Sequence, residues 1–250
     1  MVELPPRKNV QKNFKKHLTP GGSSGIFIAH TVTKNTKHTD KMKTKTLLLA
    51  AAALAATVIS SEAQVYSGIV GYVSEQFPAG AFVLACNPLD DGTNTCASVG
   101  ANLPNKSVID VWNGTGFTAC NKAAGVWTPN LSLPPGIGFF VVAKTAITNT
   151  FVGQIDTQIG GSVTNGPYAA GQFVLAGSII PFTGDLNDTN LNLGTSLPNK
   201  SVIDVWNGNG FTACNKAAGV WTPDVVITNG EGFFIVAKTA TNWVQTLPSN

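Results

Sequence analysis

Short runs of β-branched and aromatic residues recur along residues 64–250, and glycine, proline or asparagine bounds each run. Runs of this kind are typical of β-strands, whereas an amphipathic helix needs apolar positions spaced three or four residues apart. No stretch of 64–250 has that helical spacing. In the first half of this region the pattern predicts strands at residues 69–73, 81–86, 107–112, 116–120, 138–143 and 150–155.

Turn residues join these runs. Asn113-Gly114-Thr115-Gly116 predicts a hairpin, because Asn-Gly accepts the positive φ values of a tight turn. Pro134-Pro135-Gly136 interrupts the chain before Phe139-Phe140, which would place one ring in the core and one on the opposite face. Many short strands with turns between them predict an all-β fold, either an antiparallel β-sandwich or a small barrel.

One block of the sequence occurs twice. Residues 103–129 and 197–223 differ only at Thr115, which is Asn209 in the second copy, and looser similarity extends on both sides. Self-similarity of this kind predicts two tandem structural units, which we place at 64–155 and 156–250. The alternative is one sheet running through both units, with residues 151–155 as the bridge.

The region before residue 64 has the pattern of a targeting segment. Lys43 and Lys45 precede an apolar run at 47–59, and Ser61-Glu62-Ala63 places small residues at a cleavage site. This order predicts a signal peptide at 42–63 and an exported protein, extracellular, at the cell surface or periplasmic. We interpret residues 1–41 as a disordered or untranslated extension. The alternative for 42–63 is a short buried helix.

The formal charge of +3 has an uneven distribution. Residues 1–63 hold ten Lys/Arg and three Asp/Glu, whereas 64–250 hold six Lys, no Arg and ten Asp/Glu, which makes about +7 and about −4. The acidic balance of the folded region excludes the basic footprint of a nucleic-acid-binding domain. We expect no nucleic-acid partner and no membrane span in the mature chain.

Residues 64–250 contain no histidine, because all three histidines precede residue 42. This excludes histidine-based acid–base catalysis, Ser-His-Asp and Cys-His nucleophilic sets and histidine metal sites. No phosphate-binding glycine loop with a lysine is present. Asp90, Asp91, Asp185 and Asp188 lie in polar loops, where a carboxylate-based hydrolase or a calcium loop is a weak alternative. We therefore predict no enzyme, no metal and no cofactor.

The best surface candidate is the strand at 107–112. Alternation places Asp110 and Trp112 on one face and Ile109 and Val111 on the other. If the aliphatic pair faces the core, the exposed indole and carboxylate could bind a sugar ring. Asp204 and Trp206 repeat the arrangement. The alternative is that Trp112 packs against a neighbouring strand or the other unit.

Four cysteines suit an exported protein. Cys86 and Cys96 are close in sequence and occur only in the first unit, so we predict a disulfide between them. Cys120 and Cys214 occupy equivalent positions, and they either join the two units or remain buried thiols.

Several glycine, proline and aromatic motifs resemble repeats of a family of uncharacterised exported bacterial proteins. These motifs are 70–73 (VGYV), Ala79-Gly80, Asn87-Pro88-Leu89, 111–114 (VWNG), Gly116-Phe117, Pro135-Gly136 and 138–140 (GFF). The resemblance covers 66–250, although the second unit replaces Asn87-Pro88-Leu89 with Ser-Ile-Ile-Pro at 178–181. It implies export and a β fold, and it implies no activity or catalytic residue.

Together these patterns favour a secreted or cell-surface tandem-repeat protein with a structural or adhesive role and without catalysis. The second hypothesis is a carbohydrate-binding module that uses the Asp110/Trp112 and Asp204/Trp206 faces. Its partners would be extracellular polysaccharides or other surface proteins.

Overall fold

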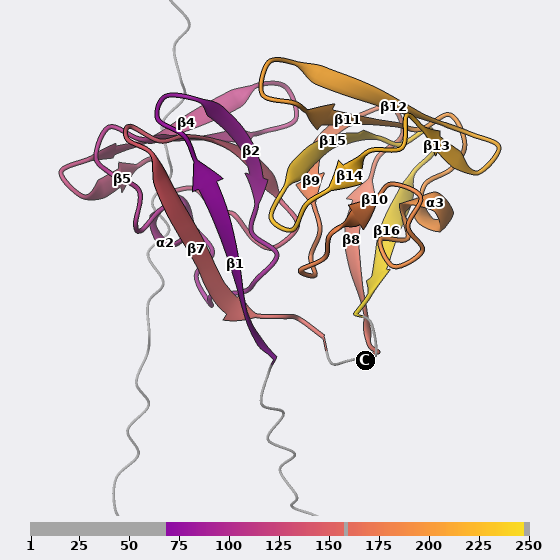
Figure 1. Cartoon of the computed structure of the whole chain (residues 1–250), viewed down its shortest axis with the longest axis horizontal. Helices are drawn as coiled ribbons and strands as arrows, with labels where there is room; N and C mark the ends of the chain where they lie inside the picture. Colours follow the sequence, from indigo (N-terminus) through magenta and orange to yellow (C-terminus); the bar gives the residue numbers. More distant parts are fainter. Residues whose placement is uncertain (1–68, 158–159, 248–250) are drawn as a thin grey trace, which may run out of the picture. The chain divides into compact units, whose positions relative to one another are not determined.

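The computed structural model describes residues 69–157 and 160–247, which belong to one compact unit, Gln64–Asn250. The predicted extension at 1–41 and the predicted signal peptide at 42–63 lie outside the described residues. The fold is all-β, as predicted, and consists of two antiparallel sandwich modules (Figure 1). We call residues 69–157 the first module and 160–247 the second module.

In the first module a five-stranded sheet faces a two-stranded ribbon. The five-stranded sheet has the order β2-β6-β3-β4-β5, with bounds Phe82–Cys86, Gly138–Val142, Val108–Trp112, Phe117–Ala123 and Val126–Thr128. The ribbon pairs β1 (Val70–Phe77) with β7 (Ile147–Gln154). The short helix α2 (Cys96–Val99) lies between β2 and β3 in sequence, and Thr95 caps its N-terminus.

The second module repeats this topology. Its five-stranded sheet has the order β9-β15-β11-β12-β13, with bounds Phe173–Gly177, Gly232–Val236, Val202–Trp206, Phe211–Ala217 and Val220–Thr222. The ribbon pairs β8 (Ser162–Tyr168) with β16 (Thr241–Thr246). The remaining elements are β10 (Gly184–Asp185), its partner β14 (Val226–Ile227) and helix α3 (Leu193–Ser196).

Each core lies between its sheet and its ribbon. In the first module Phe139 of β6 meets Phe151 of β7, with ring centroids 6.5 Å apart. In the second module Phe233 of β15 meets Trp243 of β16 at 5.7 Å. Residues 151–155 therefore belong to a ribbon of the first module, and the alternative of one sheet running through both modules is wrong.

A buried lysine is part of each core. Lys122 lies on the inward face of β4 and is only 8% exposed. Its Nζ donates hydrogen bonds to the carbonyls of Gly100, Ala101 and Leu103 at 3.1, 2.8 and 2.7 Å. These carbonyls follow α2, where a helix end leaves acceptors unsatisfied. The ammonium also lies 5.6 Å from the ring centre of Trp127.

Lys216 has the same role in the second module. It donates to the carbonyls of Gly194 and Leu197 and lies 5.8 Å from the ring centre of Trp221. Burial lowers the pKa of both lysines. Lys122 lies beyond the strand that the pattern predicts at 116–120, so the burial of these lysines was not predicted.

Candidate functional site

The five-stranded sheets of the two modules meet at β2 and β6 on one side and β9 and β15 on the other. The Cys86 amide donates to the Gly230 carbonyl at 2.6 Å, and the Gly177 amide donates to the Gly136 carbonyl at 3.1 Å. Cys86 and Gly177 are equivalent positions of the two modules, as are Gly230 and Gly136. The junction therefore has approximate twofold symmetry.

Two tryptophans extend this symmetry. The indole N–H of Trp112 donates to the Phe173 carbonyl at 2.9 Å, and that of Trp206 donates to the Phe82 carbonyl at 3.0 Å. Each indole therefore bonds to the module opposite its own. The alternative interpretation of Trp112, that it packs against the other unit, describes this contact.

The aromatic rings of the two modules form one continuous surface at the junction, which we call the aromatic face. Phe140 and Phe234 are buried at its centre, and each lies edge-on to the opposite tryptophan with ring centroids 5.4 Å apart. Phe139 points instead into the core, as the sequence predicted for this pair. The complete aromatic face comprises Phe82, Trp112, Phe117, Phe140, Phe173, Trp206, Phe211 and Phe234.

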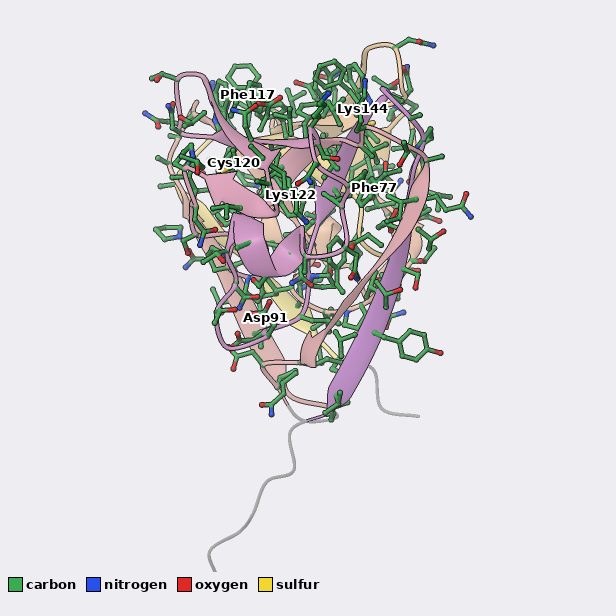
Figure 2. All side chains as sticks on the ribbon, turned by 90° about the vertical axis from the view of Figure 1, so that its left-hand side faces the viewer. Phe77, Asp91, Phe117, Cys120, Lys122 and Lys144 are labelled. Atoms are coloured by element: carbon green, nitrogen blue, oxygen red, sulfur yellow. A yellow bond between two sulfur atoms is a disulfide. The ribbon has the colours of Figure 1, made fainter. Side chains whose placement is uncertain are left out.

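Four rings of the aromatic face are open to solvent. Phe82 and Phe173 are each 52% exposed, and Phe117 and Phe211 are 44% and 45% exposed. Figure 2 shows Phe117 at the end of the molecule where such rings gather. Surface phenylalanines that occur singly need no explanation, but a cluster contributed by two modules indicates an interaction surface.

Two carboxylates lie within the aromatic face. Asp110 is half-buried and opposite Phe140 on the neighbouring strand, and Asp204 is opposite Phe234. Burial raises the pKa of both carboxyl groups, and no hydrogen bond or charge from the described residues opposes that effect. A partly desolvated carboxylate without a donor gains from a ligand that supplies one.

The structure therefore brings all four predicted site residues, Asp110, Trp112, Asp204 and Trp206, onto one surface. Sequence reasoning missed the exposed phenylalanines. The alternation rule could have found them, because Phe82 is opposite in phase to the core residue Ala85, and Phe117 is opposite in phase to the core residue Cys120.

The loop aspartates hold their own loops together. Asp90 Oδ1 accepts hydrogen bonds from the Gly92 amide and from the side chain of Asn94. Asp91 Oδ1 accepts from the backbone amides of Thr93 and Asn94. Burial acts to raise the pKa of Asp91, but these bonds prevail and lower it. Within the described residues no group of three acidic, histidine or cysteine side chains could hold a metal ion.

The disulfide joins Cys96 to Cys120, so the predicted Cys86–Cys96 pair is wrong. Cys96 begins α2, and Cys96 and Cys120 of β4 both lie in the core of the first module. Cys86 lies on the opposite face of its sheet, where its thiol donates to the Ser178 carbonyl at the module junction.

Cys214 is a free buried thiol, whereas Cys120 is bonded to Cys96, so neither alternative predicted for this pair of equivalent cysteines holds. In the aligned repeats Asn190 of the second module replaces Cys96, so the second module offers Cys214 no equivalent disulfide partner.

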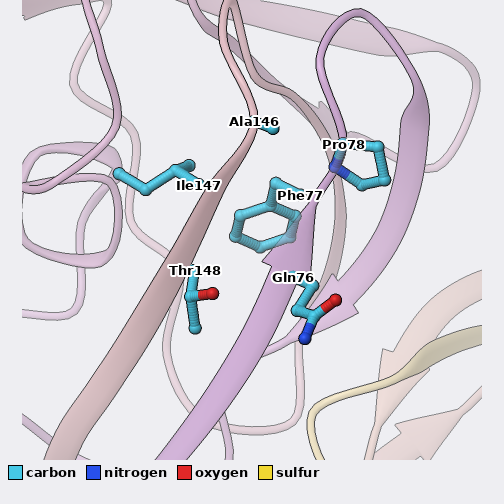
Figure 3. Close-up of a pocket in the computed structure, with 6 residues that line it drawn as sticks. All are labelled: Gln76, Phe77, Pro78, Ala146, Ile147 and Thr148. Atoms are coloured by element: carbon cyan, nitrogen blue, oxygen red, sulfur yellow. The ribbon is translucent and has the colours of Figure 1, made fainter.

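The surface of the described residues also has hollows. One, of about 360 Å³, is lined by Gln76, Phe77, Pro78, Ala146, Ile147 and Thr148 and contains no ionisable side chain (Figure 3). Another, of about 470 Å³, includes Asp90 and Asp156 among its lining residues. Both aspartates are solvent-exposed.

No helix among the described residues is long and apolar enough to cross a membrane. Comparison of the chain with protein-family models, with curated proteins and with solved structures found no match.

Proposed function

We propose that this chain is an exported structural or adhesive protein without catalytic activity, and that the aromatic face is its binding surface. The supporting observation is the exposure of four phenylalanine rings around a buried aromatic centre. The centre is rigid because both modules contribute to it and two indole N–H bonds cross it. Rigid aromatic rings bind a partner at a low entropic cost.

The face can be tested while both indole hydrogen bonds across the junction are kept. Phe117→Ser combined with Phe211→Ser removes two exposed rings, whereas tryptophan substitutions would break bonds between the modules. The matched control is Val152→Ser with Val244→Ser, because these valines are 56% and 37% exposed on the ribbons, away from the aromatic face.

We expect the phenylalanine double variant to bind polystyrene beads or insoluble polysaccharide at least about tenfold more weakly, since that factor corresponds to ~1.4 kcal/mol for two rings. Sedimentation with the beads or the polysaccharide measures the retained fraction. The valine control should bind like the unmodified chain. Equal retention of both double variants would show that the aromatic face is not the adhesive surface.

A second candidate function is carbohydrate binding, and it is favoured by the carboxylates of Asp110 and Asp204, which have no hydrogen-bond donor among the described residues. Sugar hydroxyls supply the donors that both carboxylates lack, while sugar rings stack on aromatic side chains. Asp110→Asn with Asp204→Asn separates the two functions. Carbohydrate binding predicts weaker retention on cellulose or chitin, with competition by soluble oligosaccharide. Purely apolar adhesion predicts unchanged or stronger retention on polystyrene.

A further inference from the structure

The two halves of the module junction have the same backbone contacts but different side chains. In one half, Asn165 of β8 donates its amide to the carbonyls of Gly136 and Gly177 at 3.3 and 3.0 Å. Ile137 follows Gly136 in the same turn and bridges to Ala176. The Asn165 side chain and Ile137 carry no charge at any pH. The Asn165 side chain contributes hydrogen-bond donors to this half of the junction.

In the other half, two acidic residues replace this neutral pair. Glu75 lies on the inward face of β1 between Val73 and Phe77, and its carboxyl group packs so closely on Gly230 that no Cβ would fit there. Gly230 and Glu231 correspond to Gly136 and Ile137. The Gly230 carbonyl already accepts the Cys86 amide across the junction.

The two carboxyl groups have different surroundings. Glu231 Oε2 accepts the backbone amide and the hydroxyl of Thr228, both at 2.9 Å, and these bonds favour its ionised form. Glu75 accepts no hydrogen bond from the described residues. Burial first, and then the negative charge of Glu231, raise the pKa of Glu75 from 4.5 to about 7. Burial also raises the pKa of Glu231, although the bonds from Thr228 oppose this.

We propose that Glu75 and Glu231 form a pH-sensitive latch between the two modules, closed when Glu75 is protonated and weakened when it is ionised. A protonated carboxyl group can donate to a backbone carbonyl, as the Asn165 amide does in the other half. An ionised Glu75 finds no donor among the described residues, and it faces the negative charge of Glu231. The latch is independent of what the aromatic face binds.

Asn149 faces Glu75 on β7 and does not titrate. The thiol of Cys86, whose amide bonds to Gly230, and the phenol of Tyr168 also stay uncharged between pH 5 and 8. Burial raises the pKa of the Cys86 thiol to about 12, and burial and the Cys86 charge raise that of Tyr168 well above its usual value. Because the folded-state pKa of Glu75 exceeds its ordinary value, the stabilisation is complete below about pH 4.5 and is lost as the pH rises through about 7.

Thermal unfolding of the full chain at pH 5 and pH 8 tests the latch. We expect the Tm to fall by roughly 3–6 °C over this interval. Glu75→Gln keeps a donor at every pH, so most of this fall should disappear. Asn165→Asp places an acid in the neutral half, so it should add a second fall. The latch is refuted if Glu75→Gln retains the full pH dependence of the unmodified chain.

Hydrogen exchange locates the effect at the junction. The Cys86 amide crosses the acidic half and the Gly177 amide crosses the neutral half. After correction for intrinsic rates, the protection of Cys86 relative to Gly177 should fall several-fold from pH 5 to pH 8, and Glu75→Gln should abolish the change. If the protection of Cys86 relative to Gly177 is the same at pH 5 and pH 8 in the unmodified chain, the latch is refuted. This test does not depend on whether Asn165→Asp folds. The Phe117→Ser, Phe211→Ser variant should keep the change, which separates the latch from the proposed binding function.

Discussion

Replacing Lys122 with methionine should lower the free energy of unfolding by about 2–4 kcal/mol, because buried carbonyls then lose their donor at roughly 1–3 kcal/mol each. The methionine side chain has similar length but cannot donate to Ala101 or Leu103. Urea unfolding followed by tryptophan fluorescence would measure the change.

Lys144→Met is the matched control, since Lys144 is exposed and should be nearly neutral on replacement. Lys216→Met should lower the free energy of unfolding by a similar amount, because Lys216 donates to the carbonyls of Gly194 and Leu197 in the second module. A cost below about 1 kcal/mol for both buried lysines would contradict the importance of these bonds.

Removing the disulfide with Cys96→Ala and Cys120→Ala should destabilise the protein by about 3–4 kcal/mol. The bond closes a loop with a sequence separation of 24 residues, and the estimate follows from the entropy that this loop removes from the unfolded chain. Reduction of the unmodified chain should cause a similar loss of stability.

Cys86→Ala with Cys214→Ala is the control for this prediction, because both thiols are free and buried. This variant should keep its sensitivity to reducing agent, whereas the Cys96/Cys120 variant should lose it. Recovery of a Cys86–Cys96 peptide from a non-reducing digest would contradict the assigned pairing.

The junction changes how the tryptophan motif should be understood. Trp112 and Trp206 occupy the face that strand alternation predicts, but their indole N–H groups are used between modules. They hold the aromatic face together, while the more exposed rings Phe82, Phe117, Phe173 and Phe211 remain available to a partner. The duplicated sequence therefore produces one composite surface rather than two separate ones.

The sequence by itself determined the fold class, the opposite faces of Asp110/Trp112 and Ile109/Val111, and the opposite directions of Phe139 and Phe140. Turn residues and alternation predicted β1, β2, β3, β4, β6 and β7 to within a few residues at their ends, because these signals are local. Strand β5 was missed in the first module, because a run of three residues is too short to show alternation. The four-residue helices α2 and α3 are too short to show a helical period.

Only the tertiary structure decided the disulfide pairing, the burial of Lys122 and Lys216, and the joining of both modules into one aromatic face. All three features depend on which sheet faces pack against each other. Contacts between residues that are distant in sequence determine this packing. Cys96 and Cys120 pair because both lie in the core of the first module, whereas Cys86, nearer to Cys96 in sequence, lies on the other side of the sheet. Sequence spacing carries no information about that packing, because the same spacing is compatible with either face.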